Sequence, residues 1–117
     1  MEETKLGKIE VSMPAIASLA AQAVLECYGV VGMASKDLAS GIAGTLQPGS
    51  HHRGVDVSIH GNEIVVDLYV VIQYGTRITM VAHNIQSGVK YALEKALGIP
   101  VSLVNVHVQG LRGSREV

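Results

Sequence analysis

The sequence predicts an α+β protein in which an antiparallel or mixed sheet carries two helices on one face. Asn62–Gly75 alternates in the manner of a half-buried strand, with Ile64, Val66, Leu68, Val70 and Ile72 on one side. Thr76–Leu97 instead repeats apolar residues at three- and four-residue spacing, as an amphipathic helix does. Because an apolar strand face must be covered, we expect the helix to pack on the strand, which gives a two-layer sandwich.

The first half of the chain predicts a strand, a helix and a hairpin. Gly7–Val11 is a short candidate strand, and a helix follows from the N-cap Ser12, with Pro14 in its first turn, to Gly29. Val55–His60 alternates and joins the long strand through Gly61 and Asn62, which predicts an antiparallel hairpin. The buried side of the first helix is expected to contain Ile16, Leu19, Ala20, Ala23, Val24 and Cys27, and its outer side Ala17, Ala21 and Leu25.

The second helix ends at Gly98 and Pro100, and a last strand follows at Val101–Gln109. The expected order is therefore β-α-β-β-α-β, with both helices on one face of the sheet. The buried stripe of the second helix is expected to be Ile78, Val81, Ala82, Ile85, Val89, Ala92, Leu93, Ala96 and Leu97.

A chain of 117 residues fits one domain, spanning 1–117, that buries about two-thirds of its unfolded surface. Within it, residues 32–54 are rich in glycine and are expected to form a flexible excursion. Residues 112–117 are expected to form a polar tail, in which Arg112 and Arg115 serve solubility or attach an acidic partner.

Composition and charge exclude several classes of function. A net charge of −1 and a pI near 6.5 give no field that would attract nucleic acid, and 3% aromatic residues leave few rings for stacking on RNA bases. One cysteine, Cys27, fits a reducing compartment. The most apolar stretch, Pro14–Val31, is interrupted by polar residues, so we expect a cytoplasmic protein that does not insert into the membrane directly.

The motifs that suggest a cofactor or a nucleophile are weak. His51 and His52 are adjacent, but no second metal-binding pattern accompanies them, so no metal and no cofactor are expected. Cys27 has no nearby His or Arg that would lower its pKa, so it is interpreted as a packed thiol. Gly41-x-x-Gly44 and Gly110-x-x-Gly113 are too short to indicate a phosphate site.

The sheet face turned away from the helices is the candidate interaction face. Alternation places polar residues of three strands on it, while an open sheet face lacks the walls that acid–base catalysis needs. We therefore expect no catalytic residue and no enzymatic activity, and a surface for a partner or for a second copy. The candidate residues are Asp67, Tyr69, Val71, Leu103, Asn105 and His107, and the same face is expected to carry Asp56, Ser58, His60, Val65, Gln73, Val101 and Gln109.

Five stretches of the chain, taken together, resemble the alkaline shock protein family of Gram-positive bacteria, which is also described as the envelope stress response family. They are residues 7–12, 29–32, 66–75, 81–86 and 104–110. The resemblance implies a small, non-enzymatic cytosolic protein; some members self-assemble and are held at the membrane by a separate anchor protein. The short C-terminal end resembles the housekeeping subgroup, whose genes often neighbour a dihydroxyacetone-kinase-like fatty acid kinase.

The leading functional hypothesis is a self-associating, non-enzymatic protein that acts through protein contacts at the cytosolic side of the cell envelope, in stress response or homeostasis. Its expected partners are further copies of itself and a membrane-anchored protein or a kinase-like protein. The alternative is a regulatory module that binds a small molecule through Asp67, Tyr69, Asn105 and His107 and is linked to the kinase-like partner.

Overall fold

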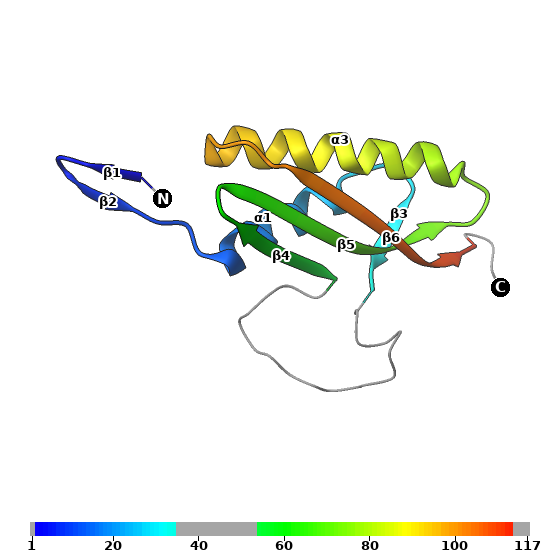
Figure 1. Cartoon of the computed structure of the whole chain (residues 1–117). Helices are drawn as coiled ribbons and strands as arrows, with labels where there is room; N and C mark the ends of the chain where they lie inside the picture. The colour runs from blue at the N-terminus through cyan, green and yellow to red at the C-terminus, as the bar shows by residue number, and fades with distance from the viewer. Residues whose placement is uncertain (1, 35–53, 114–117) are drawn as a thin grey trace, which may run out of the picture.

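A computed structural model describes residues 2–34 and 54–113 (Figure 1). In chain order, the elements are β1 (Glu2–Thr4), β2 (Gly7–Ile9), α1 (Met13–Leu25), β3 (Val30–Met33), β4 (Val55–His60), β5 (Glu63–Gln73), α3 (Ile78–Leu97) and β6 (Leu103–Arg112). The predicted α+β class is confirmed. The strands β1 and β3 were not predicted, so the observed order is longer than β-α-β-β-α-β.

The main sheet is built around β5, the longest strand. β4 pairs antiparallel with the first half of β5 and β3 with the second half, both along one edge, while β6 runs parallel along the other edge. The register places Val57 opposite Val66, and Val66 opposite Val104. The hairpin of β4 and β5 is therefore confirmed, and the sheet is mixed.

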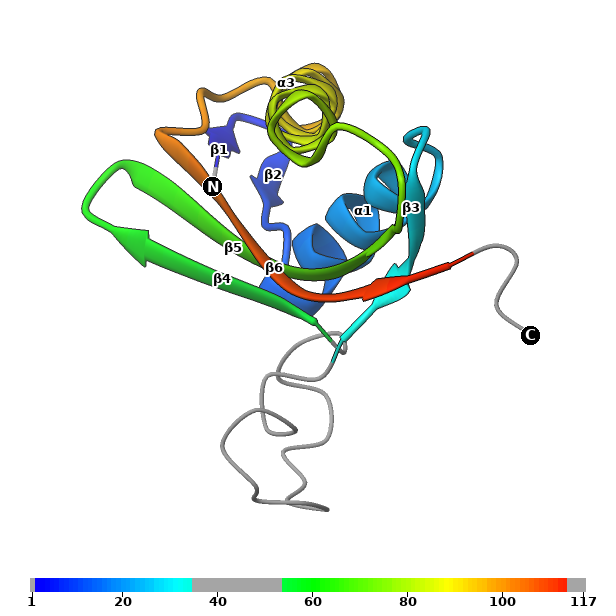
Figure 2. The same cartoon turned by 90° about the vertical axis from the view of Figure 1, so that its right-hand side faces the viewer.

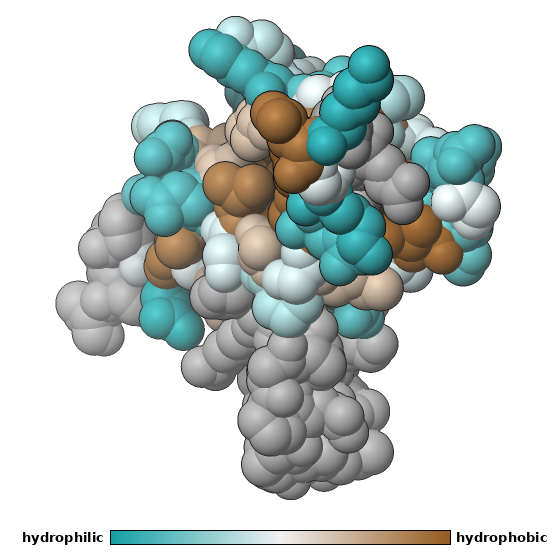
Figure 3. Space-filling model, turned by 90° about the vertical axis from the view of Figure 1, so that its left-hand side faces the viewer, coloured by the Kyte–Doolittle hydropathy of each residue, from teal (hydrophilic) through white to brown (hydrophobic). Residues whose placement is uncertain are grey.

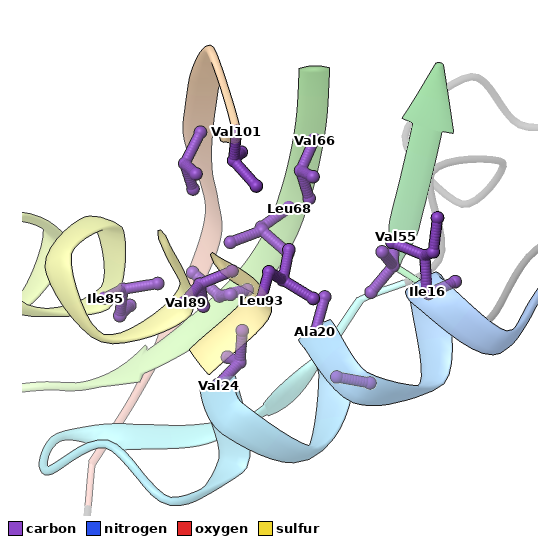
Figure 4. Packing of buried hydrophobic residues seen from close by; sticks show 14 of the residues in the cluster. Ile16, Ala20, Val24, Val55, Val66, Leu68, Ile85, Val89, Leu93 and Val101 are labelled. Carbon is purple, nitrogen blue, oxygen red and sulfur yellow. The ribbon is translucent and has the colours of Figure 1, made fainter. Parts of the chain in front are cut away.

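Both helices lie on the same face of this sheet (Figure 2). The five inward residues predicted for β5 are at most 2% exposed and belong to one core cluster with side chains of α1 and α3. Figure 4 shows two of them, Val66 and Leu68, among core residues of both helices. From α3 the core receives Val81, Ile85, Val89 and Leu93, whereas Ile78, predicted to be on the same stripe, is 41% exposed. The core is aliphatic, as the composition suggests.

The helix α1 begins as predicted but ends earlier. The Ser12 Oγ accepts a hydrogen bond from the Ala15 N–H at 3.2 Å, and Pro14 lies in the first turn. The helix stops at Leu25 rather than Gly29. Ala17 and Ala21 were predicted to face outward and are buried, because α1 packs against α3, β3 and β4 together and so buries a wide face.

The first predicted strand and the start of the glycine-rich segment also differ from the prediction. β2 pairs with β1 in a separate two-stranded sheet instead of joining β5. Gly32, predicted to begin the glycine-rich excursion, belongs to β3, and the predicted excursion otherwise lies outside the described residues except for Met33, Ala34 and Gly54. Short strands with glycine have weak sequence signals, and here pairing with β5 supplies the missing stabilisation.

The last strand runs from Leu103 to Arg112 rather than from Val101 to Gln109. Val101, predicted to face outward, is 1% exposed because it precedes the strand and turns into the core. Arg112 was assigned to the polar tail but pairs with Gln73, and its carbonyl accepts a hydrogen bond from the Tyr74 N–H at 2.8 Å. None of the helices within the described ranges is long and apolar enough to span a membrane.

A polar clamp fixes the end of α3 to the start of the last strand. The Val101 N–H donates to Glu94 Oε2 at 2.9 Å, and Lys90 Nζ donates to the Val101 carbonyl at 2.7 Å while lying 3.1 Å from Glu94 Oε2. The hydrogen bond from the Val101 backbone, helped by Lys90, lowers the pKa of Glu94. Glu94 therefore holds Val101 in its buried position as a carboxylate.

The Glu94→Gln variant is expected to unfold at a lower temperature than the wild type at neutral pH, and at a similar temperature in acid. Because the folded pKa of Glu94 lies below its unfolded value, its contribution to stability is complete above the unfolded pKa and is lost as the pH falls through the folded one. Thermal unfolding of both proteins from about pH 7 to about pH 3 measures this difference. Glu26→Gln, at an exposed position beyond the end of α1, is the control, and a difference independent of pH would contradict the prediction.

Candidate interaction surface

The outer face of the sheet carries its side chains in rows that cross the strands. In the central row Asp56 of β4 lies opposite Asp67 of β5, which lies opposite Asn105 of β6. The next row pairs Tyr69 with His107, and a row on the other side pairs Val65 with Leu103. Five of the six candidate residues lie in these rows, and Val71, two positions after Tyr69 on β5, continues the same alternation, so all six share one face. That this face binds a partner stays a prediction. The row of Asp56 and Asp67 places two carboxylates opposite each other, which is unfavourable unless donors lie nearby.

Asp67 is the acceptor at the centre of a small polar network. Its Oδ1 accepts a hydrogen bond from Asn105 Nδ2 at 3.1 Å and lies 3.0 Å from His107 Nε2. Since a carboxylate offers no hydrogen, the imidazole must carry its hydrogen on Nε2 to complete this bond. The side chains of His107 and Asp67 are 40% and 28% exposed. The network thus supplies donors to one of the two opposed carboxylates.

The rings of Tyr69 and His107 stack. Their centroids are 4.5 Å apart and their planes differ by 12°. The stack and the bond to Asp67 hold the imidazole from two directions, so the ring is fixed in place on the sheet. Sequence alternation predicted that these two residues share a face, but the stacking depends on the parallel register of β5 and β6, which the sequence does not reveal.

The backbone of Tyr69 is held where β3 ends and β4 begins. Its N–H donates to the Gly54 carbonyl at 2.8 Å, and its carbonyl accepts from the Ala34 N–H at 2.9 Å. Gly54 has φ of +80°, and a Cβ built there would lie 2.8 Å from the Ala34 carbonyl oxygen. No side chain fits this junction. Gly54 therefore helps to position the backbone of Tyr69, although it contributes no side chain to the outer face. Sequence reasoning missed this role.

Val71 lies between two glycines on the same face. It pairs with Gly32 of β3 on one side and with Gly110 of β6 on the other. A bulge between Val70 and Val71 brings Gly110 opposite Val71 and leaves Gln109 outside the pairing. Both glycines lack positive φ, and among the described residues a Cβ at either would meet no atom within 4 Å. Val71 is therefore flanked on both neighbouring strands by backbone without a side chain, which leaves room for the close approach of another surface.

Cys27, which the sequence indicates to be a packed thiol, is not part of the outer face. Cys27 lies beyond the end of α1, and its Sγ donates to the Ala23 carbonyl at 3.4 Å. Burial, and to a lesser degree the Glu26 carboxylate, raises the pKa of the Cys27 thiol, as expected for a packed thiol. It borders a groove of about 690 Å³ between α1 and α3 that is lined by Ala23, Glu26, Cys27, Gly88, Tyr91, Ala92, Lys95 and Ala96.

No group of three or more His, Cys, Asp or Glu side chains within residues 2–34 and 54–113 is arranged to hold a metal ion. His51 and His52 lie outside the described residues, as do Gly41-x-x-Gly44 and Arg115. Gly110 is part of β6.

Comparisons with known proteins indicate a family and support the fold. The family model of alkaline shock protein 23, described as having a cell envelope-related function, matches residues 1–113. The protein YloU of Bacillus subtilis is 44% identical over 110 residues, which cover 93% of this chain and 92% of the relative. The protein Spy1614 of Streptococcus pyogenes is 40% identical over 110 residues, covering 93% of this chain and 91% of the relative.

Among solved structures, the copper form of the MamM CTD superposes with a TM-score of 0.51 at 15% identity, covering 84% of this chain and 85% of that one. A nickel form of a MamM CTD variant gives the same TM-score and identity, and covers 84% of this chain and 98% of that chain. At this identity the likeness concerns the fold alone.

Proposed function

Because the chain belongs to the alkaline shock protein family, whose function is cell envelope-related, we propose that it is a non-enzymatic protein that associates with copies of itself. In this proposal the protein acts through protein contacts at the cytosolic side of the cell envelope, in stress response or homeostasis, and a membrane-anchored partner holds it there. The contact surface for self-association is the outer face of the sheet.

The proposal rests on two features of that face taken together: polar side chains that are hydrogen-bonded within one chain, and apolar side chains that lie on either side of them. Burying a polar group in an interface is costly unless it is hydrogen-bonded, and Asp67 already accepts from Asn105 and His107 within one chain. On either side of this network lie Leu103, 56% exposed, and Val71 over its two glycines. A second copy can therefore cover the face with apolar contact around a polar centre in which the two hydrogen bonds to Asp67 Oδ1 are already made within one chain.

The charge of the chain supports the same reading. A net charge of −1 imposes little repulsion between copies, so association is not opposed by long-range electrostatics. The open face does not enclose its polar groups, whereas closing a site against water strengthens the electrostatic interactions that support acid–base catalysis. The Asp67–His107 pair is accordingly interpreted as a structural element of the contact surface.

Light scattering of the purified chain across a concentration series tests the proposal. The wild type is expected to exceed the monomer mass, and Val71→Lys or Gly110→Leu is expected to reduce the mass to a smaller species. Gly110→Leu adds a side chain beside Val71 at a position where, among the described residues, the new Cβ has no atom within 4 Å. Leu25→Lys, on the exposed side of α1, is the matched control. A fall in Leu25→Lys alone would move the interface to the helix.

A wild type that stays monomeric at every concentration would contradict self-association. It would favour the alternative, a small-molecule regulatory module linked to a kinase-like partner, because the four polar residues named for that role, Asp67, Tyr69, Asn105 and His107, do come together.

A further inference from the structure

The hairpin of β1 and β2 forms an arm, defined here as residues 2–9, at one end of the molecule's longest axis, which measures 59 Å (Figure 1). The side chain of Leu6, in the turn between the two strands, is 99% exposed, and that of Ile9 is 57% exposed. A two-stranded hairpin alone is only marginally stable in water. An arm that displays apolar side chains at its tip is therefore expected to gain stability from packing against another surface.

An apolar cavity lies at the same end of the molecule. We call it the end pocket; its volume is about 450 Å³, and it is formed by the tip of the β4–β5 hairpin and the link from α3 to β6. Its lining residues are Ile59, Gly61, Asn62, Ile64, Ile99 and Pro100. Ile59 is 38% exposed although it belongs to a strand face that is otherwise covered. Figure 3 views this end and shows apolar surface gathered between hydrophilic side chains.

The arm of a chain does not fill that chain's own end pocket, because Leu6 is almost fully exposed. We propose that Leu6 of one copy enters the end pocket of a second copy, and that the second copy returns the same contact. Since arm and pocket lie at the same end, two copies that meet end to end around a two-fold axis satisfy both contacts at once. The result is a closed, reciprocal arm exchange.

Charge favours a second copy of this chain as the occupant. The arm carries Lys5 and Lys8 on either side of Leu6, and both are exposed; Lys8 pairs with Glu10 at 3.2 Å, which leaves Lys5 as the cation nearest to the tip. The tip of the β4–β5 hairpin carries the exposed Glu63, next to the pocket residues Asn62 and Ile64. The arm as a whole is formally neutral, because it also carries Glu2 and Glu3, so the complementarity is local: Lys5 beside Leu6 and Glu63 beside the pocket have opposite charges, and their pairing favours the same reciprocal alignment.

This contact rests on the proposed self-association and adds to it, because the arm and the end pocket share no residue with the outer-face contact at Val71. Two separate contacts on one chain permit assembly beyond a dimer. They also make the two proposals separable by mutation, since a change in the arm leaves the outer face intact.

Sedimentation velocity of the full chain across a concentration series tests the arm exchange. Leu6→Asp is expected to weaken the end contact at least tenfold and to remove one step of assembly, while the circular dichroism spectrum is unchanged because Leu6 is exposed. Met80→Asp, which alters a 48% exposed side chain on α3, is the matched control and is expected to assemble as the wild type does. Lys5→Glu and Glu63→Lys are each expected to weaken assembly, and the double variant to restore it.

The outcomes distinguish the arm exchange from the outer-face contact. Loss of one assembly step in Leu6→Asp, with restoration in the Lys5→Glu/Glu63→Lys double variant, supports arm exchange. Wild-type assembly in Leu6→Asp, together with weakened assembly in Val71→Lys, overturns the arm exchange and leaves the outer-face contact standing. A wild type that is monomeric throughout overturns both.

Discussion

Gly54→Ala is expected to be one of the most destabilising single substitutions in this chain, lowering the free energy of unfolding by roughly 2–4 kcal/mol. Two costs add at this position. The backbone has φ of +80°, which L side chains rarely adopt, and the new Cβ would lie 2.8 Å from the Ala34 carbonyl oxygen and 3.0 Å from the Met33 Cβ. The clash would part the ends of β3 and β4 where both bond to the backbone of Tyr69.

Gly61→Ala is the matched control for this prediction. Gly61 also has positive φ, +66°, but no atom would lie within 4 Å of its Cβ, so only the backbone term of about 1 kcal/mol is expected. Chemical denaturation of the three proteins measures both changes. Equal losses in the two variants would show that the close packing at the β3–β4 junction contributes nothing, and that the backbone conformation alone explains the glycine.

A second readout connects this junction to the outer face. If Gly54 positions Tyr69, its replacement should disturb the Tyr69–His107 stack as well as stability, and the imidazole resonances of His107 should shift in Gly54→Ala but not in Gly61→Ala. A fold that merely loses stability would leave the folded-state resonances where they are.

The sequence predicts the parts of this structure that depend on regular periodicity. The alternation in β5 and the stripe on α3 are both long, so the main strand, its helical cover and the antiparallel hairpin follow from them. The composition of the outer face at Asp67, Asn105 and His107 follows from the same alternation, because register is set by which face is buried.

The parts of the structure that could not be predicted depend on which strands pair with each other rather than on the periodicity of the sequence. β3 has four residues and contains Gly32, so nothing local distinguishes it from a turn until β5 supplies its hydrogen bonds. The bulge beside Val71 moves Gly110 into the place expected for Gln109, and no feature of the sequence marks it. Val101 looks like a strand residue, but the clamp from Glu94 and Lys90 directs it into the core.

The burial of the inner face and the exposure of the outer face should give opposite results for two leucine-to-alanine substitutions. Leu68→Ala removes a side chain that is 0% exposed at the centre of the core, so the expected loss is about 2–5 kcal/mol, composed of lost transfer energy and the cavity left behind. Leu103→Ala removes a side chain that is 56% exposed on the outer face, so its unfolding free energy should change by no more than about 0.5 kcal/mol.

In a measurement of self-association, the order should be reversed: Leu103→Ala should have the larger effect and Leu68→Ala the smaller one. At temperatures where both are folded, Leu68→Ala should still assemble, because its outer face is unchanged, whereas Leu103→Ala should shift the assembly equilibrium toward smaller species. Denaturation and light scattering on the same samples give both quantities. If Leu103→Ala assembled like the wild type while Leu68→Ala did not, the apolar flank of the outer face would not be the contact, and association would instead depend on the integrity of the core.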